Sequence, residues 1–268
     1  MLFSYKVRKI MMKRIEISLK NINWRLYVAL LVMGLCPTIY TTVRTFFLGQ
    51  LPGEWAYSIA GQLSWINLIY EIVNEAIILP LFFFVGKVIE NKNEFINRLK
   101  TGLLISLLIY SILSILIIIY AEQMLSAMAT TKEIIPESAK YVRIESIANI
   151  FGILLSFSSV ALISLGKDKL IYILTVTKLV LCLIFDTFLV STLPFSANLG
   201  VNGIAYSNVI VNGLLFVTVI VILAKQGYSI LNKDKISFTW AKEFVKIGGV
   251  SGVESFVRNI AYILMVSR

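Results

Sequence analysis

The chain has 268 residues, of which 58% are hydrophobic and 15% charged, and it carries a formal net charge of +10. A soluble protein carries about a quarter charged residues, so this composition excludes an ordinary soluble domain. Apolar runs of about twenty residues recur along the whole length, and they predict an all-α, polytopic membrane protein. The sequence has no histidine, which excludes histidine-dependent hydrolases and acyltransferases and histidine-ligated metal sites, and we expect neither an enzyme nor a cofactor.

The chain begins with a basic segment, residues 1–25, which we expect at the cytoplasmic membrane interface, either as an amphipathic helix or as a disordered tail. Six apolar runs then form a predicted transmembrane lobe over residues 26–224, each about as long as a bilayer requires. We place them at 26–48, 58–86, 101–120, 141–165, 170–193 and 199–224. A basic linker, 225–246, precedes a seventh apolar run, 247–268, inside which the sequence stops.

The charges of the connecting segments alternate along the chain. The basic ones are the N-terminus, 87–100, 166–169 and 225–246, whereas 50–57, 121–140 and 194–198 are acidic or neutral. Because basic loops stay on the cytoplasmic side, the pattern predicts a plasma-membrane protein with a cytoplasmic N-terminus and six complete crossings. The basic residues therefore indicate membrane topology and contact with lipid headgroups, and we expect no nucleic-acid partner.

The second apolar run carries a polar stripe near its middle. Glu71, Asn74 and Glu75 share one helical face, which Asn67 extends by a turn. A carboxylate in hydrocarbon is costly unless it faces a cavity, finds a partner or takes up a proton, and two neighbouring carboxylates repel each other when both are ionised. This pattern is typical of a site that exchanges protons or cations. The alternative is a pair of structural carboxylates bonded to neighbouring helices.

Charged residues also lie in the first and fifth runs. Lys178, Cys182 and Asp186 line one face of the fifth run, with Lys178 near mid-membrane. Asp186 lies at a depth similar to that of Arg44 in the first run, so an ion pair between them is geometrically possible. Alternatively, Arg44 snorkels to the outer interface. Lys178 is too deep to snorkel easily, and we expect it to face a partner or water.

Polar residues of the fourth and seventh runs have structural alternatives. Glu145 and Asn149 begin close to the outer interface, where we favour interfacial anchoring or a structural salt bridge. Glu254 and Arg258 are four residues apart in the sequence, so in a helix they can partly neutralise each other. Both a site role and a structural role stay open for this second pair.

Four stretches resemble the multidrug and toxic compound extrusion (MATE) family of secondary transporters. They are Pro37 followed by Val43-Arg44-Thr45-Phe46-Phe47-Leu48-Gly49, the turn Gly166-Lys167-Asp168-Lys169, Asp186, and Leu199-Gly200-Val201-Asn202-Gly203-Ile204-Ala205, the most specific match. The resemblance implies two six-helix lobes, of which this chain holds the first. The seventh run would then open the second lobe, and we expect the native chain to continue past Arg268.

The resemblance also implies roles for individual residues. Asp186 falls on the family's acid in helix 5 and Glu254 on its acid in helix 7, whereas Arg44 replaces a helix 1 aspartate thought to bind the coupling ion. We therefore expect Arg44 to pair with Asp186, and ion coupling to move to Glu71 and Glu75. The candidate set consists of the ion-coupling residues Glu71, Glu75, Asp186 and Glu254 and the cavity residues Arg44, Asn67, Asn74, Lys178, Cys182 and Arg258.

The function implied by the resemblance is export of organic cations or drugs through alternating access, by antiport with H⁺ or Na⁺. The expected partners are a small organic cation, the lipid bilayer and a missing C-terminal lobe. One alternative is a flippase for lipid-linked sugars or lipid phosphates, in which Arg44, Lys178 and Arg258 hold a phosphate. Another is an inactive half-transporter. A membrane prenyltransferase is disfavoured because the sequence lacks Asp-rich magnesium motifs.

Overall fold

The computed structural model describes residues 24–51, 56–128, 130–230 and 236–266, so most of the basic segment 1–25 lies outside the described residues. The described part folds into long α-helices: α2 (Trp24–Gln50), α3 (Ala56–Gly86), α4 (Lys92–Ala127), the 3₁₀ turn η1 (Lys132–Ile134), α5 (Ile135–Ser164), α6 (Asp168–Leu189), α7 (Val201–Lys225) and α8 (Ala241–Val266). Helices α3 to α7 are each long and apolar enough to cross a membrane. The prediction of an all-α, polytopic membrane fold is confirmed.

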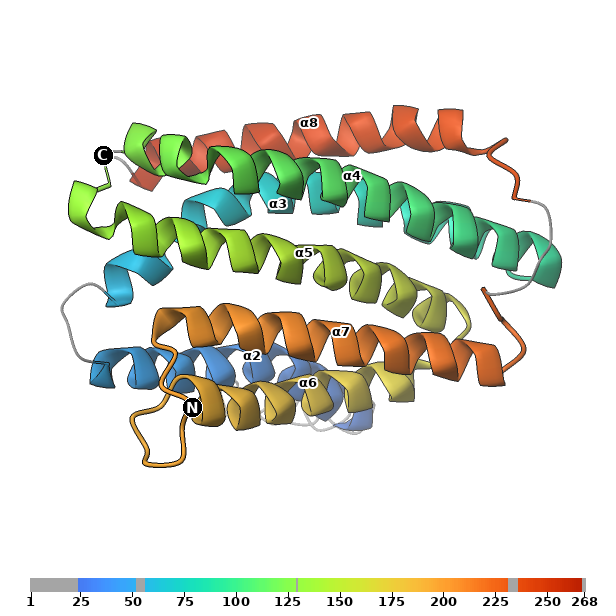
Figure 1. The fold of residues 1–268 in the computed structure, drawn as a ribbon. Helices are drawn as coiled ribbons and strands as arrows, with labels where there is room; N and C mark the ends of the chain where they lie inside the picture. Colours follow the sequence, from blue (N-terminus) through green and yellow to red (C-terminus); the bar gives the residue numbers. More distant parts are fainter. Residues whose placement is uncertain (1–23, 52–55, 129, 231–235, 267–268) are drawn as a thin grey trace, which may run out of the picture.

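Helix α5 lies at the centre of the bundle (Figure 1). It packs against α3, α4 and α7, while α6 packs on α7 and α2, and α8 packs along α3. Buried apolar side chains such as Phe157 and Leu162 fill the contacts of α5. Helix α6 is far less enclosed, since Leu174, Cys182 and Asp186 are its only buried residues. Partly buried apolar residues of α6, such as Leu181 and Phe185, still pack against the core.

Helix α4 begins earlier than the hydropathy predicts. It starts at Lys92 rather than near residue 101, so much of the expected charged loop is helical. Asn91 caps this start by accepting a hydrogen bond from the backbone N–H of Glu94 (3.2 Å), and Glu94 pairs with Arg98 one turn later (2.9 Å). Hydropathy marks only the membrane-embedded part of a helix, whereas caps and ion pairs extend it into water. Helix α8 likewise begins before its apolar run.

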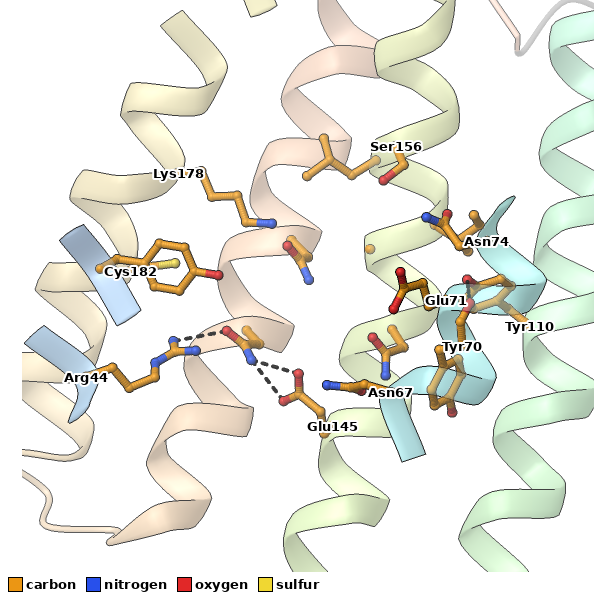
Figure 2. A pocket seen from close by; sticks show the side chains of 17 residues that line it. Arg44, Asn67, Tyr70, Glu71, Asn74, Tyr110, Glu145, Ser156, Lys178 and Cys182 are labelled. Atoms are coloured by element: carbon orange, nitrogen blue, oxygen red, sulfur yellow. Dashed lines mark hydrogen bonds between the residues drawn. The ribbon is translucent and has the colours of Figure 1, made fainter. Parts of the chain in front are cut away.

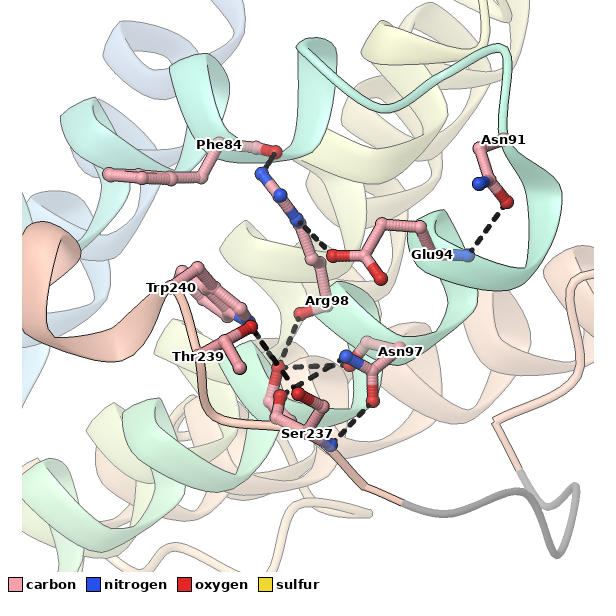
Figure 3. Close-up of polar contacts among 9 residues, drawn as sticks. Phe84, Asn91, Glu94, Asn97, Arg98, Ser237, Thr239 and Trp240 are labelled. Carbon is pink, nitrogen blue, oxygen red and sulfur yellow. Dashed lines mark hydrogen bonds and ion pairs between the residues drawn. The ribbon is translucent and has the colours of Figure 1, made fainter.

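The segment that precedes α8 is bound to the first turns of α4 (Figure 3). The side chain of Asn97 accepts a hydrogen bond from the Ser237 N–H (2.9 Å) and donates one to the Ser237 carbonyl (3.1 Å). The indole N–H of Trp240 donates to the hydroxyl of Thr101 (3.1 Å). The α3–α4 and α7–α8 connections therefore lie at the same end of the bundle, as their shared basic character leads one to expect.

Candidate functional site

A polar cavity of about 380 Å³ opens between α2, α6 and α7 on one side and α3, α4 and α5 on the other (Figure 2). Most of its lining residues are amides, charged residues and tyrosines. They are Tyr40, Arg44, Asn67, Tyr70, Glu71, Asn74, Tyr110, Glu145, Asn149, Gly152, Ile153, Leu155, Ser156, Lys178, Cys182, Asn208 and Asn212. Within membrane-spanning helices, ionisable groups around a cavity mark a path or binding site for a solute.

A chain of hydrogen bonds joins four helices beside this cavity. Arg44 on α2 donates to Asp186 on α6 through Nε to Oδ2 (2.8 Å) and Nη2 to Oδ1 (3.3 Å). The same Nη2 donates to Oδ1 of Asn208 on α7 (3.1 Å). The Nδ2 of Asn208 in turn donates to both carboxylate oxygens of Glu145 on α5 (2.8 and 2.9 Å). The hypothesised Arg44–Asp186 ion pair is thus present, and Arg44 does not snorkel to the interface.

Glu145 lies inside the bundle, and its interpretation as an interfacial anchor is wrong. Only 7% of the residue is exposed. Helix α5 begins at Ile135, so Glu145 lies well along the helix, and Asn149 one turn later also lines the cavity. Arg143, by contrast, forms the kind of structural salt bridge expected in this region, an exposed pair with Glu122 (3.0 Å). Distance from the apolar boundary in the sequence did not reveal which side chains turn inward.

The polar stripe of α3 forms the opposite wall. Asn67, Glu71 and Asn74 line the cavity, and Glu71 points into it (Figure 2). Beside them, the rings of Tyr70 and Tyr110 lie with their centroids 5.6 Å apart, and the Tyr110 hydroxyl donates to the Tyr70 carbonyl (3.0 Å). These contacts hold this wall firmly against α4.

Helix α6 contributes Lys178 and Cys182 to the cavity. Cys182 is buried with a free thiol. Lys178 is half-buried, and its ammonium group points into the cavity (Figure 2). Among the residues that the structure describes, this ammonium group forms no hydrogen bond or ion pair.

Three further candidates lie apart from the cavity, where α3 meets α8. The Glu75 carboxylate accepts hydrogen bonds from the Arg258 guanidinium, so Arg258 pairs with α3 rather than with Glu254. Glu254 is exposed. Glu71 and Glu75, although neighbours on one stripe, therefore have different surroundings. The candidate residues divide into a cavity group and a helix-contact group.

The sequence interpretation missed the amides of α7. Asn208 and Asn212 are four residues apart and line the cavity with Glu145 and Asn149, which are also four residues apart, on α5. Polar pairs at this spacing within apolar helices were a usable signal, because they place polar groups on one helical face.

A bundle of membrane-length helices around a polar, charged cavity is the architecture of a membrane transporter. Residues 29–188 match the model of the MatE family. Because this match covers more than half of the chain, the chain belongs to the MatE family. The resemblance to MATE transporters is thereby confirmed.

Solved structures share the fold. A multidrug resistance MATE family transporter of the MOP superfamily, in an outward-facing conformation, is 16% identical with a TM-score of 0.77, covering 91% of this chain and 54% of that one. A second similar structure is a MOP superfamily transporter from Pyrococcus furiosus, for which a reversed polarity of the binding pocket suggests a different function. It is 16% identical with a TM-score of 0.78, and the match covers 91% of this chain and 54% of that one. A mutant of the Vibrio cholerae MATE transporter VcmN is 14% identical with a TM-score of 0.78, and the match covers 91% of this chain and 55% of that one. The chain spans about half the length of these transporters, and no curated protein sequence matches it.

Proposed function

We propose that the chain forms one lobe of a secondary active transporter in the plasma membrane, which exports organic cations or drugs by antiport with H⁺ or Na⁺. Membership of the MatE family supports a transport function. Because the chain spans about half of the similar transporters, the activity would belong to this lobe together with a second one. The lobes would move against each other and open the cavity to the two sides of the membrane alternately.

The observation that carries this proposal is the presence of two carboxylates at the cavity that no arginine or lysine neutralises by direct contact. Among the described residues Glu71 forms no ion pair, and the carboxylate of Glu145 is bound by the neutral amide of Asn208. Asp186 and Glu75 are instead each paired with an arginine. A carboxylate without a fixed counterion can bind a proton, a metal cation or an organic cation in turn, and antiport requires this exchange.

We therefore assign ion coupling to Glu71 and Glu145. The guanidinium of Arg44 stays charged at any physiological pH and already contacts Asp186 at 2.8 Å. A sodium ion beside Asp186 would be repelled by this fixed cation. We therefore expect ions to be exchanged at Glu71 and Glu145 instead of at Asp186.

Transport by vesicles that contain both lobes tests the proposal. An imposed proton or sodium gradient should drive movement of a fluorescent organic cation. Glu71→Gln and Glu145→Gln should each slow this transport by roughly tenfold. Each substitution removes a carboxylate charge that would bind the cation, and a hydrogen bond to a charged group contributes about 1.5–3 kcal/mol. Glu122→Gln removes an exposed acid (55% exposed side chain) and should leave the rate unchanged. Gradient-driven transport at the native rate in the Glu71→Gln/Glu145→Gln double variant would refute the assignment.

The flippase alternative is less well supported by the cavity. It requires bases that can hold a phosphate, but the guanidinium groups of Arg44 and Arg258 are engaged by carboxylates. Lys178 is the one remaining base of the three, and it faces a cavity that also holds acids. The same vesicles, tested for movement of a fluorescent lipid phosphate, distinguish the two functions.

A further inference from the structure

Helix α8 packs along α3 through a close backbone contact. Gly248 and Gly252 of α8 are four residues apart and share one helical face. A Cβ on Gly248 would lie 2.5 Å from the carbonyl oxygen of Ala76 on α3, and a Cβ on Gly252 would lie 3.1 Å from the Ala76 Cβ. Glycines at this spacing allow two membrane helices to approach closely. The backbones of α3 and α8 therefore meet at this level without a long side chain between them.

Two further groups of contacts hold α8 on either side of the glycines. Toward the end of the helix, the Arg258 guanidinium donates to the carboxylate of Glu75 on α3. At its start, the ring of Phe84 on α3 lies against the rings of Trp240 and Phe244, with centroids 5.5 and 6.0 Å away. All three aromatic residues are buried. Separation of α8 from α3 would expose these rings and break the ion pair, and both changes are unfavourable.

The segment that leads into α8 is held by α4 as well (Figure 3). The Asn97 side chain bonds both the N–H and the carbonyl of Ser237 (2.9 and 3.1 Å), and the Trp240 indole donates to the Thr101 hydroxyl (3.1 Å). A hinge is a short segment whose backbone absorbs a large change of conformation. A backbone bonded on both its polar groups to another helix is poorly suited to this role, so α8 enters the bundle from a fixed point.

We propose that α8 moves as part of the first lobe, and that the α3–α8 contact stays closed while the transporter opens to either side of the membrane. The order of the sequence assigns α8 to the second lobe, whereas its contacts join it to the first. The remainder of the transporter would then move against the opposite face of α8, where Val250, Val253 and Val257 are exposed. This inference rests on the transport function proposed above and locates its moving boundary.

A disulfide across the α3–α8 contact tests the inference. Disulfides join Cβ atoms about 3.5–4.5 Å apart, and the Cβ atoms at residues 76 and 252 would lie 3.1 Å apart, so a small relaxation suffices in Ala76→Cys/Gly252→Cys. The variant is made in the transporter with both lobes, placed in vesicles and oxidised with copper phenanthroline. The crosslinked protein should transport the fluorescent organic cation as fast as the same protein after reduction with dithiothreitol.

The single variants Ala76→Cys and Gly252→Cys are the matched controls. Neither can form this crosslink, so each reports the effect of the oxidant on the native thiols Cys36 and Cys182, which are both buried. Mass spectrometry of proteolytic fragments measures the crosslinked fraction of the double variant. Transport before oxidation shows that each variant is folded.

A distance measurement tests the inference without a crosslink. Spin labels are attached to Ile112→Cys on α4 and Val257→Cys on α8, at positions that are 61% and 60% exposed. Electron spin resonance of the labelled pair should give one distance distribution, the same with and without the organic cation. A shift of the mean distance when the cation is added would contradict the inference.

The possible results separate the inference from the proposed function. Transport that is lost on crosslinking and restored on reduction overturns the inference, because α8 must then part from α3, and it leaves the export of organic cations standing. Transport that persists at complete crosslinking supports the inference. Absence of gradient-driven transport by the wild-type protein refutes the proposed function, and the inference falls with it.

Discussion

Arg44 on α2 and Asp186 on α6 form a two-point ion pair, with Nε to Oδ2 at 2.8 Å and Nη2 to Oδ1 at 3.3 Å. The side chain of Asp186 is 2% exposed and that of Arg44 is 14% exposed. The charges of this aspartate and this arginine would each be costly alone within the membrane, and the pair neutralises both. The pair also joins α6, which buries few apolar residues, to the rest of the bundle.

The stability of the lobe should depend on this pair being complete. Asp186→Asn should lower the free energy of unfolding by about 3–5 kcal/mol, because it leaves a buried guanidinium without its counterion. The double variant Arg44→Met/Asp186→Leu should lose much less, because it removes both charges. Unfolding in mixed micelles measures each value. As a control, Glu122→Gln breaks an exposed pair with Arg143 and should cost less than about 1 kcal/mol. An equal loss of stability in Asp186→Asn and Glu122→Gln would contradict the prediction.

Asn208 should matter more than its neighbour on the same helix. Asn208→Ala removes the donor of both hydrogen bonds to Glu145 and one acceptor for Arg44, so it should cost about 1–3 kcal/mol. Asn212→Ala, which removes one bond to the Ala148 carbonyl (3.2 Å), should cost less. A double-mutant cycle with Glu145→Gln should reveal a non-zero coupling energy, and strict additivity would show that the Asn208–Glu145 contact contributes nothing.

Two adjacent glycines of α8 should respond oppositely to alanine. A Cβ at Gly248 would lie 2.5 Å from the Ala76 carbonyl oxygen of α3, whereas a Cβ at Gly249 would meet no atom within 4 Å. Gly248→Ala should therefore force α8 away from α3 and destabilise the protein by about 1–3 kcal/mol. Gly249→Ala should stabilise it by about 0.5–1 kcal/mol through helix propensity. Thermal unfolding of the two variants measures the change in stability of each. Changes in the same direction would count against the close α3–α8 contact.

The contact that binds the segment before α8 should rest on Asn97. Asn97→Ala removes both hydrogen bonds to the Ser237 backbone, so the amide hydrogen of Ser237 should exchange with solvent markedly faster. Hydrogen–deuterium exchange measures this rate. Asn93→Ala, at an exposed position one turn earlier, should leave the rate as it was, and an unchanged rate in Asn97→Ala would rule out the contact in solution.

The fold was largely predictable from the sequence because hydropathy and loop charge depend on single residues. The apolar run that became α3 and the order of the long helices followed directly from hydropathy along the sequence. The start of α4 did not, because the cap by Asn91 and the Glu94–Arg98 pair lie in a charged stretch that hydropathy assigns to a loop. Hydropathy locates the bilayer rather than the ends of a helix.

The site was predictable only in part, because a helical face is visible in a sequence but its partner is not. The Arg44–Asp186 pair could be inferred from equal depth, and the stripe with Glu71 from spacing. The place of Glu145 in the site could not be predicted without α7, because Asn208 of that helix binds its carboxylate. Glu75 required knowledge of α8, which supplies Arg258.

The ion pair between α2 and α6 also constrains how the chain is made. Arg44 and Asp186 are 142 residues apart, so at about 5–20 residues per second the ribosome needs roughly 7–28 s to supply the partner of Arg44. During this interval α3, α4 and α5 are synthesised while the arginine of α2 has no acid from α6. Until α6 is made, the guanidinium of Arg44 must stay near water, lipid phosphate or the insertion machinery. A nascent chain interrupted before α6 would leave this arginine without its counterion.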